Sequence, residues 1–209
     1  MNLPQYREND PVGNLVLYLN TRMQLSAAFN PSILPMLKSE PLAEKLIITR
    51  PGHVSVMAYW IDNFYACSYK MVPDKNGRLE KKIVEILPPK SIVLDPIGFF
   101  ANEASDHFLE IVKGANIVPF SQDYFAKLKL TAPEAETLAN CIMAELMAQS
   151  KTRMGLLSLK GDERYYELIN QYGIEILQCF SQKNLASYLN YTPQHLNRLI
   201  SGDHRTGRD

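Results

Sequence analysis

Three side chains near the carboxyl end of the sequence have the chemistry to read nucleic-acid bases. Gln194, Asn197 and Arg198 stand at relative positions i, i+3 and i+4, so a helix would present them on one face. Gln and Asn amides pair with adenine through two hydrogen bonds, and an Arg guanidinium pairs with guanine in the same way. We therefore expect this face to meet the major groove of DNA.

A helix-turn-helix between Ser181 and Gly202 would position these side chains. Asn190 falls in the turn, where a positive φ is expected and Asn is the best occupant other than Gly. Thr192 and Pro193 restart the chain as N-cap and first helical residue. The small Ala186 stands where the two helices approach most closely. The apolar positions that would join the helices are Leu185, Leu189, Tyr191, Leu196 and Leu199.

Two further polar residues suit phosphates better than bases. His195 lies at the flank of the second helix, and Lys183 lies in the first helix. Periodicity alone leaves open the alternative of an αα-hairpin without a DNA partner. The candidate DNA contacts are Thr192, Pro193, Gln194, His195, Asn197, Arg198 and Lys183.

The overall charge argues against a polybasic nucleic-acid binder, because Lys plus Arg and Asp plus Glu both total 22. Any DNA affinity must come from a local patch or a dimer. Cys67, Cys141 and Cys179 are far apart and form no C-x-x-C pair, so neither a disulfide framework nor a zinc site is indicated. No stretch approaches the length of a membrane span, and we expect a cytoplasmic protein.

The first half of the chain has the pattern of a β domain with helices before it. Residues 12–29 predict a helix, and a short helix is expected around Leu42–Leu46. From there to Leu128 the pattern is that of short strands separated by turns, which is typical of an antiparallel sandwich or barrel. The predicted strands are 46–49, 54–60, 64–71, 79–87, 92–94, 108–112 and 115–120.

Helices follow the sheet. Thr131 and Glu134 form the pattern of a capping box before an apolar stripe, which predicts a long helix over 132–157. Such a helix is too long for a small β domain to cover, so we expect part of it to pack against a second copy of the chain. A further helix is predicted over 162–172, with Gly173 at its end.

The order of these elements resembles the Crp/Fnr family of bacterial transcription regulators over nearly the whole chain. The closest local match is Phe180–Ile200, and Asp162–Leu168 resembles the linker helix of Bacteroidetes-type members. The resemblance implies an α+β fold with an N-terminal antiparallel β-roll or jelly roll with flanking helices, a long dimerisation helix and a C-terminal helix-turn-helix domain. The corresponding ranges are 1–130 for the cyclic-nucleotide-binding-like sensor domain, 131–158 for the dimerisation helix and 159–209 for the DNA-binding domain, which lacks a full wing and ends in a short basic tail.

The resemblance also implies partners and contacts. The partners are double-stranded DNA at a two-fold symmetric site, a second copy of the chain, RNA polymerase and a small-molecule effector of unknown identity. Arg198 matches the guanine-reading arginine of the family. Gln194 stands where many members have glutamate, so we expect a changed base preference there.

The effector region departs from the family pattern. Cyclic-nucleotide members pair the cyclic phosphate with an arginine, but here no arginine occurs between Arg78 and Arg153. We therefore expect no control by cAMP through that arginine. Phe99, Phe100 and Glu103 are the candidate effector contacts. Three scattered cysteines are also too few for the four-cysteine iron–sulfur cluster of the oxygen-sensing branch.

Two other functional classes remain open. One is a dimeric sensor or scaffold with this fold that does not bind DNA. The other is an enzyme with a metal site in the β domain, but His53 and His107 show no metal-binding spacing with the nearby glutamates, so we expect no catalysis and no metal.

Overall fold

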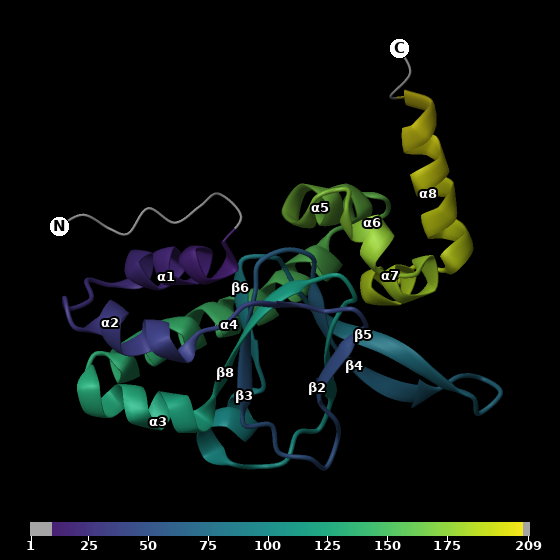
Figure 1. Ribbon diagram of the computed structural model, residues 1–209. Helices are drawn as coiled ribbons and strands as arrows, with labels where there is room; N and C mark the ends of the chain where they lie inside the picture. The colour runs from purple at the N-terminus through teal and green to yellow at the C-terminus, as the bar shows by residue number, and fades with distance from the viewer. Residues whose placement is uncertain (1–9, 207–209) are drawn as a thin grey trace. The chain divides into compact units, whose positions relative to one another are not determined.

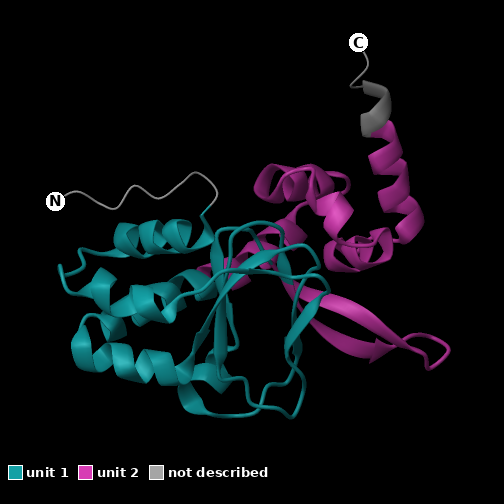
Figure 2. Cartoon of the chain, in the orientation of Figure 1, with its two compact units in different colours: residues 1–66, 87–147 teal, residues 67–86, 148–209 magenta. Residues whose placement is uncertain are grey.

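The computed structural model describes residues 10–206, with side chains from residue 10 to residue 202. Two compact units divide the chain, as Figure 2 shows: the first joins the chain up to Ala66 to Leu87–Met147, and the second joins Cys67–Ile86 to the segment that begins at Ala148. The second unit therefore contains both a β-hairpin and the carboxyl-terminal helices. Within the described residues, no helix combines the length and apolarity needed to span a membrane.

The first helix, α1 (Pro11–Arg22), begins at a side-chain cap. The Asp10 carboxylate accepts a hydrogen bond from the backbone N–H of Val12, and Pro11 occupies the first helical position. The predicted helix over 12–29 is too long, because the backbone becomes extended at Met23. Phe29 instead begins α2 (Phe29–Ile33), which continues as the 3₁₀-helix η1 (Leu34–Met36).

The predicted helix at Leu42–Leu46 is wrong. The Leu42 N–H donates to the Ala115 carbonyl at 2.8 Å, and the Leu42 carbonyl accepts from the Gly114 N–H at 2.9 Å. These bonds pair the segment with a distant part of the chain, so the short strands β1 (Glu40–Pro41) and β2 (Leu46–Thr49) form on either side of it. Tertiary pairing thus overrides a weak helical pattern.

The expected antiparallel β architecture is confirmed, with two four-stranded sheets in the orders β1-β8-β3-β6 and β2-β7-β4-β5 (Figure 1). In the first sheet, Trp60 of β3 lies opposite Val118 of β8 on one side and Ile92 of β6 on the other. Predicted strand positions agree with the structure to within a few residues. The remaining strands are β3 (Met57–Ile61), β4 (Ala66–Pro73), β5 (Leu79–Leu87), β6 (Ser91–Leu94), β7 (Phe108–Ile111) and β8 (Asn116–Ser121).

The sheet ends earlier than predicted, because the helix α3 (Gln122–Thr131) follows β8 directly. The predicted capping box is also wrong. Thr131 ends α3, and its hydroxyl donates to the Leu128 carbonyl at 3.1 Å. Glu134 accepts a hydrogen bond from the Ser26 N–H at 3.0 Å, which lowers the pKa of its carboxyl group. Glu134 therefore ties the loop after α1 to the start of the next helix.

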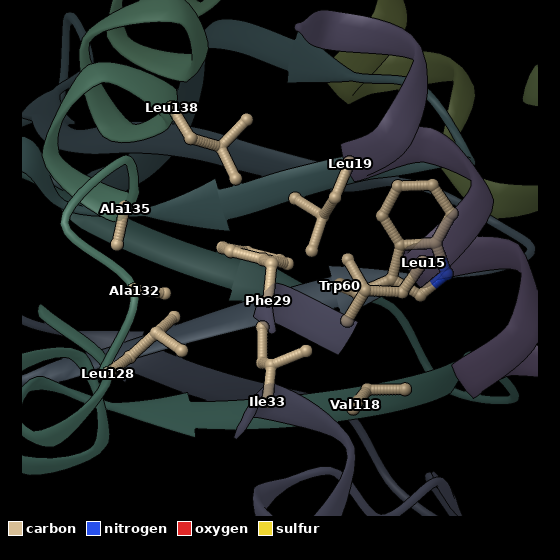
Figure 3. Packing of buried hydrophobic residues seen from close by; sticks show 10 residues of the cluster. All are labelled: Leu15, Leu19, Phe29, Ile33, Trp60, Val118, Leu128, Ala132, Ala135 and Leu138. Carbon is tan, nitrogen blue, oxygen red and sulfur yellow. The ribbon is translucent and has the colours of Figure 1, made fainter. Parts of the chain in front are cut away.

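The predicted long helix is confirmed as α4 (Ala135–Ser158). Its amino-terminal turns contribute to the core of the first unit, where side chains from α1, α2, α3 and α4 meet those of β3 and β8 (Figure 3). Further along the helix, Met147 and Met154 expose 64% and 67% of their surface. The core residues drawn in Figure 3 are Leu15, Leu19, Phe29, Ile33, Trp60, Val118, Leu128, Ala132, Ala135 and Leu138.

The helical part of the second unit contains α5 (Glu163–Tyr172), α6 (Ile176–Cys179), α7 (Gln182–Leu189) and α8 (Pro193–Thr206). Gly173 ends α5 with a positive φ of 80°, as predicted, whereas α6 was not predicted. The expected tail after Ser201 is corrected, because α8 continues to Thr206 through Gly202, and a single Gly costs a helix only about 1 kcal/mol. The tail cations Arg205 and Arg208 lie outside the described side chains.

Candidate nucleic-acid interface

The ends of α7 and α8 are set by local hydrogen bonds. The Ser181 hydroxyl accepts from the Asn184 N–H at 3.2 Å and begins α7. Asn190 ends it in the left-handed region, at φ 55° and ψ 42°. The Thr192 hydroxyl accepts from the His195 N–H at 3.2 Å, and Pro193 is the first residue of α8. The predicted turn and helix restart are therefore confirmed.

Apolar side chains hold α7 against α8. Leu185, Leu189 and Leu196 have no exposed surface, and Leu199 exposes 7%. Ala186 is also fully buried, as expected where two helices approach closely. Tyr191 is only half-buried. Since the buried residues of α8 share one side of the helix, its opposite side is left for polar residues.

The structure brings the predicted base-reading side chains together on that exposed side. Gln194, Asn197 and Arg198 are all exposed, and Arg198 leaves 70% of its side chain accessible. Thr192 and Pro193 are exposed at the amino-terminal end of the same helix. The helix therefore presents one continuous polar face with amide and guanidinium donors.

Asp162 is a neighbour of this face that the sequence analysis did not find. Its Oδ1 lies 2.9 Å from His195 Nε2 and 4.0 Å from Arg198 Nη2. Arg198 Nη2 also lies 3.3 Å from His195 Nδ1. The sequence marks Asp162 only as the residue before a helix, and no local signal indicates that its carboxylate faces α8. In this arrangement Asp162 supports the side chains of His195 and Arg198 from behind.

Tyr191 adds a second tie between α8 and the start of α5. Its hydroxyl donates to the Gly161 carbonyl, and its ring lies with its centroid 4.6 Å from that of His195. Burial raises the pKa of the Tyr191 hydroxyl, so it remains a donor at neutral pH. These contacts fix the amino-terminal end of α8 within its unit.

The local charge of the helix-turn-helix is positive. Between Ile176 and Gly202 the sequence has two cations, Lys183 and Arg198, and no Asp or Glu. Lys183 lies on α7, where its Nζ pairs with Glu80 Oε1 of β5 at 2.6 Å while 62% of its side chain stays exposed. The predicted phosphate contact is therefore accessible but paired with a carboxylate.

The candidate effector residues lie in the first unit. Phe99 and Phe100 belong to the one-turn π-helix η2 (Ile97–Ala101), and their ring centroids are 5.0 Å apart. Both line a cavity of about 80 Å³ whose walls are almost entirely apolar. Glu103 is exposed and does not line this cavity, so the structure does not bring all three residues together. Among residues 10–202, no group of three or more His, Cys, Asp or Glu is placed to hold a metal ion.

Searches with the sequence match no protein-family model, and no curated protein matches either. The fold, by contrast, is similar to solved bacterial proteins. FixK2 from Bradyrhizobium japonicum has a TM-score of 0.61 and 15% identity, covering 82% of this chain and 86% of that chain. CLP from Xanthomonas campestris, a c-di-GMP-responsive global regulator, has a TM-score of 0.58 and 13% identity, covering 87% and 93%.

A transcriptional regulator of the CRP family from Thermus thermophilus, TTHB099, has a TM-score of 0.58 and 14% identity, covering 81% of this chain and 85% of that chain. These likenesses extend over both units and most of each neighbour. The chain therefore has the fold of Crp/Fnr-type regulators, with an antiparallel β-roll, a long helix and a helical carboxyl-terminal part, which confirms the predicted fold class.

Proposed function

We propose that the protein is a DNA-binding transcriptional regulator that reads the major groove with α8. The observation that carries this proposal is the exposed polar face of α8, where Gln194, Asn197 and Arg198 lie side by side on a helix fixed by its own core. The absence of carboxylates from Ile176 to Gly202 supports it, because DNA repels negative charge.

Each side chain of this face has a distinct expected role. Arg198 has the geometry to pair with guanine, and Gln194 and Asn197 have the geometry to pair with adenine. Thr192, Pro193 and His195 lie at the end of the helix that would approach the backbone, and Lys183 would contact a phosphate from α7. Because Gln194 replaces the glutamate of many similar proteins, the site should favour adenine where those proteins select cytosine.

Binding as a homodimer is the second part of the proposal. Met147 and Met154 leave apolar surface exposed on α4, and the same helix of a second copy would cover it. Two copies related by a two-fold axis would place two α8 helices in successive major grooves, about 34 Å apart. As the sequence predicted, such a regulator acts in the cytoplasm, and RNA polymerase is its expected partner at promoters.

Control by cAMP through an arginine is not part of the proposal. The region that would face a cyclic phosphate contains Asp95, which is 1% exposed and has neither carboxylate oxygen hydrogen-bonded within the described structure. A second negative charge there would be repelled. The effector, with Phe99, Phe100 and Glu103 as its predicted contacts, stays a prediction.

Selection from randomised duplexes followed by fluorescence anisotropy tests the proposal. We expect affinity to fall steeply as salt rises, because phosphate contacts release counterions. Arg198→Ala should lower specific affinity by about 5- to 150-fold, the equivalent of about 1–3 kcal/mol for one bidentate base contact. Arg50→Ala, which removes an exposed arginine outside the second unit, is the matched control and should change affinity less than twofold. The proposal fails if the wild-type protein shows no salt-dependent binding to any duplex.

A dimeric sensor that does not bind DNA is the second candidate. It is favoured by the carboxylates beside the cations of the helix-turn-helix, Glu80 at Lys183 and Asp162 at Arg198. This candidate predicts a dimer in sedimentation equilibrium and no change in anisotropy with any duplex.

A further inference from the structure

A polar groove of about 290 Å³ lies within the second unit, between the β4–β5 hairpin and the helix-turn-helix. Both elements belong to the same compact unit, drawn in magenta in Figure 2. One wall of the groove comes from the hairpin and the other from α7, the turn and the start of α8. The lining residues are Val72, Glu80, Lys81, Lys82, Lys183, Ser187, Asn190, Tyr191 and Pro193.

The charge of the groove suits an anion. Lys81, Lys82 and Lys183 contribute three ammonium groups, and Glu80 is the one carboxylate among the residues that line it. Lys183 is paired with Glu80, whereas Lys82 is exposed on the hairpin. Lys81 Nζ lies 4.0 Å from the centroid of the Tyr69 ring, which holds this ammonium group in place.

The neutral polar groups of the groove can also donate to an anion. Ser187 contributes a hydroxyl group and Asn190 an amide group from the helix-turn-helix wall. A tetrahedral oxyanion accepts several such hydrogen bonds at once, in addition to its attraction to ammonium groups. The combination of three lysines with hydroxyl and amide donors therefore points to a phosphate.

The position of the groove identifies the source of that phosphate. Pro193 lines the groove and is also the first residue of the helix whose outer face carries Gln194 and Arg198. A duplex whose major groove received α8 would bring its sugar–phosphate backbone past the amino-terminal end of that helix. The nearest phosphates would then be those of the DNA strand itself.

We propose that this groove holds a backbone phosphate of the bound DNA, and that the β4–β5 hairpin is therefore part of the DNA interface. The inference rests on the proposed function and adds to it a phosphate contact from the β domain, with Lys82 as its principal cation. Glu80 occupies Lys183 in the absence of DNA. On binding, its carboxylate faces the incoming phosphate, so Glu80 weakens binding.

Anisotropy titrations of the full-length protein test this inference with a selected duplex and a scrambled duplex. Lys82→Gln should reduce affinity for both duplexes by about 3- to 10-fold and lower the slope of log Kd against log salt by about one, as expected for the loss of one phosphate contact. Glu80→Gln should raise affinity for both by about two- to fivefold. Lys75→Gln is the matched control, because Lys75 is exposed on the same hairpin and does not line the groove.

The outcomes separate this inference from the proposed function. If Arg198→Ala loses specific binding while Lys82→Gln behaves like the wild type, the groove inference is overturned and the regulator stands. An equal loss of affinity in Lys75→Gln would mean that general hairpin charge, and not the groove, attracts DNA. If calorimetry shows that inorganic phosphate or pyrophosphate binding depends on Lys82 while DNA binding does not, the groove takes free phosphate and the DNA assignment fails. If the wild-type protein binds no duplex, both proposals fail.

Discussion

Replacement of Asn190 tests whether the turn of the helix-turn-helix is maintained by backbone conformation. Asn190 has φ 55° and ψ 42°, and its N–H donates to the carbonyls of Ala186 and Ser187. A residue with a Cβ pays about 1–2 kcal/mol in this region, Asn pays less because its amide bonds locally, and Gly pays almost nothing. Because Asn190 is exposed, replacing it creates no cavity. Asn190→Ala should therefore lower the free energy of unfolding by about 1 kcal/mol, and Asn190→Gly should change it by less than about 0.5 kcal/mol.

Urea and thermal denaturation followed by the helical circular dichroism signal measure these differences. A loss of about 1 kcal/mol corresponds to a fall in Tm of roughly 2–4 °C for a chain of this size. Asn197→Ala is the matched control, because Asn197 is exposed in the interior of α8 and Ala is the better helix former, so stability should rise by a few tenths of a kcal/mol. The reasoning is refuted if Asn190→Ala is as stable as the wild type, or if Asn190→Gly is the least stable of the three.

Three other expectations concern stability. A Cβ at Gly98 would lie 2.7 Å from the backbone N of Ser55, so Gly98→Ala should cost about 1–3 kcal/mol in chemical denaturation. A Cβ at Gly155 of α4 would meet nothing within 4 Å, so Gly155→Ala should instead stabilise by about 0.5–1 kcal/mol in the same assay. Burial, together with the hydrogen bond to Glu145, raises the pKa of Tyr18 to about 12. The neutral phenol is favoured in the folded state, so its stabilisation is complete below the unfolded pKa of about 10 and is lost as pH rises through about 12, which ultraviolet titration compared with Tyr18→Phe would detect.

Local sequence signals were sufficient for the helix-turn-helix. A residue tolerant of positive φ, a hydroxyl cap and a proline lie at Asn190, Thr192 and Pro193, and each acts within three or four residues of chain. The strands were also recognisable, because short apolar runs between turns have few other stable arrangements. These features do not depend on distant partners.

The errors arise where distant residues decide the outcome. The segment around Leu42 is extended because its backbone pairs with Gly114 and Ala115. Glu134 bonds to Ser26, so it does not form the local capping box. Likewise, no local pattern could show that Asp162 lies beside His195 and Arg198, or that Glu80 lies beside Lys183. The composition of α3 is mixed, and α6 is a single turn, so both lack a strong helical period.

Hydroxyl-radical footprinting on a selected duplex tests the central claim most directly, because it maps where α8 contacts DNA. Two copies of the helix in successive major grooves predict two equivalent protected regions with centres about 10–10.5 bp apart, related by a two-fold axis. Arg198→Ala should weaken both regions equally. A duplex that stays uniformly cleaved at protein concentrations that saturate the dimer, or a single asymmetric protected region, would contradict the account.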